Sequence, residues 1–122
     1  MNQIIERKIG DSKDLDFTLN LTNYYGKVGA DITDIFFTIK KQKGDADTSL
    51  FLKKASAGQI TYNGQEIVNV LVKWPYNEYS QFQAKKQYVA GVYPKFSGDI
   101  IADENVDIEF DLIFLDDTLK QN

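Results

Sequence analysis

The feature that most constrains this chain is a two-residue alternation of apolar and polar side chains. Residues 15–21 place four large apolar side chains on one face and polar side chains on the other. Residues 106–112 repeat the pattern, with carboxylates as the polar set. Because successive side chains of a strand point to opposite faces, each stretch predicts a strand with one buried face.

Similar segments recur along the chain. Strands are predicted at residues 35–40, 66–73 and 88–93, with shorter candidates at residues 4–8, 50–53 and 59–62. The pair Asn63-Gly64 is typical of a two-residue hairpin turn, and Pro75 should end the strand before it. Residues 77–83 are predicted to form at most one short helical turn, capped by Asn77. We therefore expect an all-β, antiparallel sandwich of 7–8 short strands, formed by residues 1–122 as a single domain.

The apolar positions of these alternations predict the centre of the core. They are Phe17, Leu19, Phe37, Ile39, Val70, Val92, Phe110 and Leu112.

Composition removes most enzyme classes. The chain contains no cysteine and no histidine, which excludes thiolate nucleophiles, serine–histidine and cysteine–histidine catalysis, and histidine-ligated metals. We therefore expect no catalytic centre, no cofactor and no metal site. A small-molecule ligand is not expected either.

Nucleic acid and membrane are also unexpected partners. Arg7 is the single arginine, whereas readout of bases and clamping of phosphates usually depend on arginine. The net charge is −4, and no stretch approaches the roughly 18 apolar residues of a membrane span. The first residues do not resemble a signal peptide, so synthesis without secretion is expected.

Two groups of carboxylates are candidate sites. Asp103 and Glu104 precede the last predicted strand, and Asp116 and Asp117 follow it. Such pairs occur in glycosidases, but in a small sandwich solvent-exposed loop charges are expected. The stretch Asp45-Ala46-Asp47 resembles part of a calcium loop without its distal glutamate, so a turn capped by Asp side chains is expected.

Aromatic residues make up 13% of the chain, more than one small core needs. Exposed tyrosine and tryptophan are favoured at protein interfaces and on surfaces that stack against sugars, although some of these rings could instead close the ends of the sandwich. Ile113 and Leu115 continue the outward, acidic face of the last strand. The predicted interface set is Tyr24, Tyr25, Phe36, Tyr76, Tyr79, Ile113 and Leu115.

The order of short motifs resembles a known family. It comprises residues 16–19, residues 31–41, the acidic stretch 45–47, residues 52–54, Phe82, residues 88–93 and the alternating last strand. This order, over residues 9–115, is similar to the immunoglobulin-like β-sandwich modules of tailed-phage particles. Examples are the N-terminal domain of baseplate upper proteins and related domains of head fibres, tail fibres and capsid accessory proteins. Phe82 and Tyr88 resemble the tyrosine corner of such folds.

The resemblance implies a non-enzymatic virion protein, made in the host cytoplasm. Its partners would be other virion proteins, namely the major capsid, fibre or baseplate proteins. Because the chain holds one module, a small accessory subunit that decorates a capsid or adapts a fibre is expected. Trp74 at a strand end, and the lack of cysteine, depart from many sandwiches of this type.

A carbohydrate-binding module is the alternative. Its stacking platform would use Tyr24, Tyr25, Tyr76 or Trp74. A flat row of exposed rings would favour sugar binding, whereas rings buried against another chain would favour assembly. A small hydrolase is a third possibility, and its general base would have to be a carboxylate.

Overall fold

Each stretch of alternating sequence forms a strand. The computed structural model describes residues 3–22, 26–46, 48, 50–97 and 107–115. Its strands are β1 (Gln3–Lys8), β2 (Leu15–Asn20), β3 (Ile32–Lys40), β4 (Phe51–Lys54), β5 (Ile60–Gly64), β6 (Ile67–Val72), β7 (Gln87–Phe96) and β8 (Ile108–Leu115). Two short 3₁₀ turns, η1 (Gly29–Asp31) and η2 (Ala55–Ala57), lie between strands. The described residues contain no α-helix, and the all-β prediction is confirmed.

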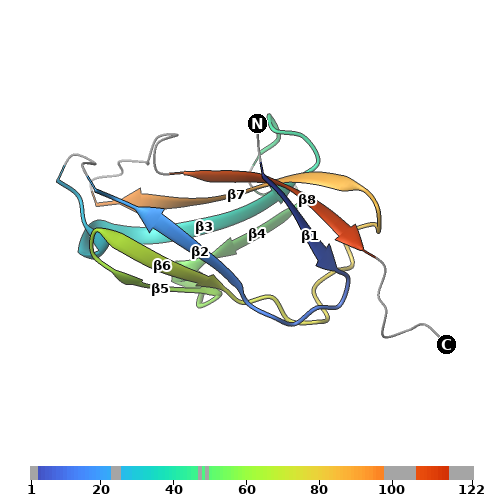
Figure 1. Cartoon of the computed structure of the whole chain (residues 1–122), viewed down its shortest axis with the longest axis horizontal. Helices are drawn as coiled ribbons and strands as arrows, with labels where there is room; N and C mark the ends of the chain where they lie inside the picture. The colour runs from blue at the N-terminus through green and yellow to red at the C-terminus, as the bar shows by residue number, and fades with distance from the viewer. Residues whose placement is uncertain (1–2, 23–25, 47, 49, 98–106, 116–122) are drawn as a thin grey trace.

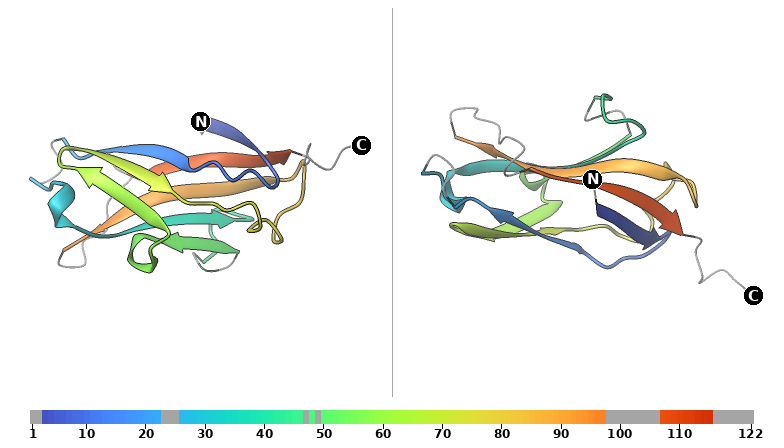
Figure 2. Two further views of the ribbon diagram at one scale, coloured as in Figure 1. Left: turned by 90° about the horizontal axis from the view of Figure 1, so that it is seen from below. Right: turned by 45° about the horizontal axis from the view of Figure 1, so that its top comes forward.

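The strands form two sheets that lie face to face (Figures 1 and 2). The larger sheet has the order β1-β8-β7-β3-β4, and the smaller one has the order β2-β6-β5. All pairings are antiparallel except that of β1 with β8, which is parallel. The purely antiparallel prediction is therefore wrong at β1. The chain leaves β1 for the other sheet, so no hairpin fixes the direction of this edge strand.

The core fills the space between the sheets. All eight residues predicted for its centre are buried, which confirms the register of the alternating strands. Phe17 of β2 stacks on Phe110 of β8, with ring centroids 5.4 Å apart, so this contact joins the two sheets. Phe37 of β3 packs against both rings.

A cluster of aromatic rings closes one end of the sandwich. Its members are Phe51, Trp74, Tyr79, Phe82, Tyr88 and Phe114, all buried. The predicted helical turn at residues 77–83 is absent, because this segment runs as successive turns. These turns direct Tyr79 and Phe82 inward, and the Trp74 indole N–H donates to the carbonyl of Glu78 at 2.8 Å.

The β5–β6 hairpin forms, but its turn differs from the prediction. Asn63 pairs with Asn69 and Gly64 with Val68, so Asn63-Gly64 belongs to the ladder and residues 65–66 connect β5 to β6. Gly64 has a φ of 118°, and the backbone of Gly29 packs directly on its carbonyl. The Gly29 N–H also donates to the Gln65 carbonyl at 2.8 Å. This tertiary contact moves the turn along the chain.

Two cationic side chains lie inside the fold. Arg7 stacks over the Trp74 ring and donates to the Tyr79 hydroxyl and to the carbonyls of Asp11 and Lys13. Lys53 of β4 forms an ion pair with Glu78. Each charge has a hydrogen-bonding partner, as buried charges require.

Candidate binding site

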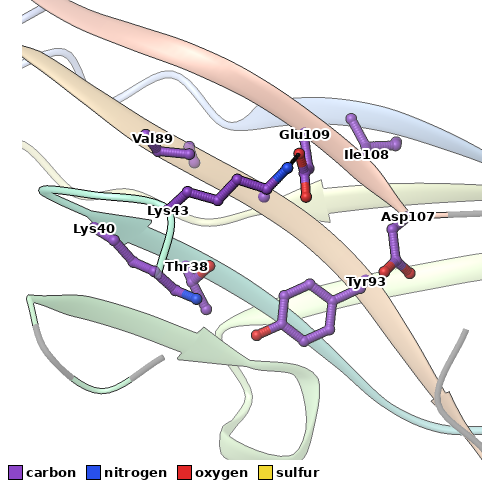
Figure 3. Close-up of a pocket in the computed structure, with 10 residues that line it drawn as sticks. Thr38, Lys40, Lys43, Val89, Tyr93, Asp107, Ile108 and Glu109 are labelled. Carbon is purple, nitrogen blue, oxygen red and sulfur yellow. Dashed lines mark ion pairs between the residues drawn. The ribbon is translucent and has the colours of Figure 1, made fainter. Parts of the chain in front are cut away.

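A shallow hollow lies on the outer face of the larger sheet, over β3, β7 and β8. Its volume is about 180 Å³, and Figure 3 shows the side chains around it. It is lined by Thr38, Lys40, Lys43, Val89, Ala90, Gly91, Tyr93, Asp107, Ile108 and Glu109.

Gly91 produces the hollow. In register across the sheet, Thr38 of β3 pairs with Gly91 of β7, and Gly91 pairs with Glu109 of β8. Gly91 has no side chain to fill the row between its two neighbours. A Cβ built there would lie 3.3 Å from the Ile108 carbonyl oxygen and 4.0 Å from Thr38 Oγ1. The floor of the hollow is therefore backbone, bordered by the Thr38 hydroxyl.

Lys43, in the segment that follows β3, borders one side of the hollow. Lys43 extends across β7, and its Nζ lies 3.3 Å from Glu109 Oε2 (Figure 3). Both side chains are largely exposed, so solvent screens this ion pair and its contribution to stability is small. The Lys43–Glu109 ion pair is therefore not a main support of the fold.

The charges around the hollow balance. Lys40 and Lys43 stand against Asp107 and Glu109, and the Tyr93 ring borders the site beside Asp107 (Figure 3). An anion would meet two carboxylates and a cation would meet two ammonium groups. The side chains around the hollow therefore favour neither an anion nor a cation by net charge.

Within the predicted interface set, Tyr76 is the most exposed described residue, with 70% of its surface accessible to solvent. Phe36 lies on the outer face of β3 and is half-buried, because the Tyr93 ring lies 5.5 Å away and Lys54 Nζ approaches within 5.8 Å. Tyr24 and Tyr25 lie outside the described residues.

Ile113 and Leu115 lie on the outer face of β8, as predicted. Glu6 and Lys8 of β1 pair with them and leave both only partly exposed.

The prediction that Tyr79 and Trp74 are exposed is wrong, because both rings are buried. Tyr79 is buried against Trp74, with centroids 4.9 Å apart and nearly parallel planes. Trp74 retains 1% exposure, so it cannot serve as a sugar platform in this fold. Both rings instead close the end of the sandwich, which was the alternative considered for the aromatic residues.

Of the carboxylates considered as candidate sites, only Asp45 is described by the structure. Asp103, Glu104, Asp116 and Asp117 lie outside the described residues, as does Asp47. Asp45 accepts the Gln42 N–H at 3.2 Å through Oδ2, so it caps a turn as expected. Within the described part of the chain, no group of three or more acidic side chains is arranged to hold a metal ion.

Among the carboxylates of the described residues, Asp34 has a shifted pKa. Burial by itself raises the pKa of Asp34, but hydrogen bonds from Ser56 Oγ, Ser56 N–H and Ile35 N–H, with help from Lys54, outweigh it and lower the pKa. These bonds attach η2 to β3. Asp34 is thus a structural acceptor between two segments.

Sequence reasoning did not find the hollow. Its determinants are Gly91 and Thr38, and neither residue type has reactive chemistry of its own. A glycine within the alternating stretch of residues 88–93 was an available signal, since an interior glycine often marks a close approach to a strand. Only the register shows that Thr38 and Glu109 flank it.

Comparison with protein-family models, with curated proteins and with solved structures finds no match to this chain. No helix among the described residues is long and apolar enough to cross a membrane.

Proposed function

We propose that this chain is a non-enzymatic, immunoglobulin-like docking module of a tailed-phage virion, a small accessory subunit on the capsid or a fibre. The strand arrangement supports the fold part of this proposal. In immunoglobulin-like sandwiches, the second, fifth and fourth strands (B, E and D) face the third, sixth and seventh (C, F and G), and variable-type domains add C′ beside C. Here β2, β6 and β5 face β3, β7 and β8, with β4 beside β3.

One further detail supports the same assignment. The Tyr88 hydroxyl accepts the backbone N–H of Gln83, five residues upstream, at 2.9 Å. A tyrosine near the start of strand F that bonds back to the upstream backbone is the tyrosine corner of these folds. The one departure is β1, which pairs with β8 rather than with β2.

The observation that carries the docking function is the edge strand β5. It pairs with β6 on one side only, and its sequence Ile-Thr-Tyr-Asn-Gly contains neither a charge nor a proline. Natural edge strands are usually protected by such residues. The other three edge strands contain charged residues, namely Glu6, Arg7 and Lys8 in β1, Asp16 in β2, and Lys53 and Lys54 in β4.

An unprotected edge is suited to accept a strand from a partner. Addition of a strand gives main-chain hydrogen bonds without special side chains. Thr61, Tyr62 and Asn63 of β5 are all exposed, and β5 pairs with no second strand among the described residues. The outer face of β6 beside it displays Ile67 and Leu71.

The experiment is to purify phage particles on a density gradient from infected cells that express this chain. The amount of the chain in the particles is then measured by quantitative mass spectrometry. The chain should sediment with the particles in a fixed ratio to the major capsid protein. The double variant Thr61→Lys/Asn63→Lys should be lost from particles, because edge lysines oppose strand pairing. Asn69→Lys, on the central strand of the same face, is the matched control and should be incorporated normally. A chain found only in the unsedimented fraction would contradict the virion assignment.

A further inference from the structure

We propose that the hollow over Thr38, Gly91 and Glu109 is a binding subsite for one ring of a neutral saccharide. It lies on the larger sheet, whereas the proposed docking edge β5 belongs to the smaller sheet. The two functions therefore do not compete for the same residues. This inference departs from the sequence-based expectation that no small molecule binds.

The first support is the state of Thr38. This residue is 2% exposed, yet it lines the hollow, and no hydrogen bond to its hydroxyl is present among the described residues. The Thr38 hydroxyl oxygen borders the open hollow and is not an enclosed, unsatisfied group, so it is accessible to a ligand there. A hydroxyl group of a ligand above Gly91 would be able to donate to Thr38 or to accept from it.

The second support is the hydrogen-bonding capacity that remains around the hollow. A carboxylate offers about four acceptor positions and an ammonium group three donors. The single contact between Lys43 and Glu109 therefore leaves both groups with capacity for a ligand. Hydroxyl groups both donate and accept, so a polyhydroxylated ring is able to use carboxylates and ammonium groups together. Simple ions cannot do this.

The third support is shape. The volume of about 180 Å³ is below the roughly 300–1,000 Å³ of pockets for drug-sized ligands, and so suits a single small ring. The Tyr93 ring flanks the site and offers an apolar surface next to polar groups (Figure 3). The backbone floor at Gly91 lets a flat ligand approach the sheet closely.

The test is a titration of the ¹⁵N-labelled chain, followed by amide chemical shifts. The probes are glucose, galactose, mannose and N-acetylglucosamine, with inorganic phosphate as an anionic comparator and glycine as a zwitterionic one. At least one neutral sugar should shift amides of residues 38, 91 and 109 in a saturable manner, and neither comparator should do so. Saturable shifts with phosphate or glycine alone, or no localised shift with any of the four sugars, would overturn the proposal.

Two variants separate the site from general effects on folding. Thr38→Val removes the hydroxyl while keeping the side-chain shape, and should weaken binding by about 3- to 10-fold, the usual value of one hydrogen bond. Gly91→Ala places a methyl group on the floor and should weaken binding further. Thr18→Val, on the outer face of the smaller sheet, is the matched control and should leave the affinity unchanged. Equal affinity in Thr38→Val, Gly91→Ala and the wild type, with all three folded, would also overturn the proposal.

Discussion

The Arg7 guanidinium lies over the Trp74 ring, with Cζ 4.6 Å from the ring centroid. No described carboxylate pairs with it. Instead, the Tyr79 hydroxyl accepts from Nε at 2.6 Å, and two backbone carbonyls accept from one terminal nitrogen. This arrangement attaches the edge strand β1 and the chain after it to the aromatic end of the sandwich, because Tyr79 also donates to the carbonyl of Asp11.

Replacement of Arg7 by lysine should destabilise the fold strongly despite the retained charge. An ammonium group cannot stack flat on the indole or reach three acceptors in different directions. The expected loss is about 2–4 kcal/mol in the free energy of unfolding, measured by urea denaturation. Lys8→Met, at the next and exposed position of β1, is the control and should change stability by less than about 0.5 kcal/mol. An unchanged unfolding midpoint in Arg7→Lys would show that the stack contributes little.

Tyr79 should make stability depend on alkaline pH. Burial raises the pKa of its hydroxyl, and the nearby Asp11 and Glu78 act in the same direction, while the hydrogen bond and charge of Arg7 oppose the increase. A raised folded-state pKa means that its contribution is complete below the ordinary value near 10 and is lost as pH rises through the folded-state value. The difference in unfolding free energy between the wild type and Tyr79→Phe should therefore shrink from about pH 9 to about pH 11. A constant difference across that range would contradict the raised pKa.

Phe110 tests the register of β8. Its ring is buried and packs on Phe17 and Phe37, whereas the neighbouring Asp111 points to the outer face. Phe110→Ala should cost about 3–5 kcal/mol by the usual effect of a large cavity. Asp111→Ala should change stability by less than about 1 kcal/mol. Since a slip by one residue exchanges the two faces, the reverse order of effects would show that β8 pairs in another register.

The register of β8 was readable from the sequence because Phe110 and Leu112 alternate with carboxylates, and only one face of a strand can be buried. The same reasoning failed for Arg7 and Lys53. Both occupy inward positions that a charge normally avoids, and their partners Tyr79 and Glu78 lie far away in the sequence. Neither the parallel direction of β1 nor the hollow at Gly91 could be predicted, because both depend on which strands become neighbours. Local pattern does not determine that.

The backbone of Gly29 in η1 lies directly against the carbonyl of Gly64 in the β5–β6 hairpin. A Cβ on Gly29 would lie 1.9 Å from the Gly64 carbonyl oxygen, which no real side chain tolerates. Since that oxygen belongs to backbone, relief requires a shift of the hairpin, and Gly29→Ala should cost at least the roughly 1–3 kcal/mol of overpacking. Gly44 is the matched control, because a Cβ there would meet nothing within 4 Å. Gly44→Ala should leave stability unchanged or raise it by up to about 1 kcal/mol through the unfolded state. Thermal unfolding of both variants is the measurement. Equal midpoints would mean that the hairpin does not rest on Gly29 and that the displaced turn at residues 65–66 has another cause.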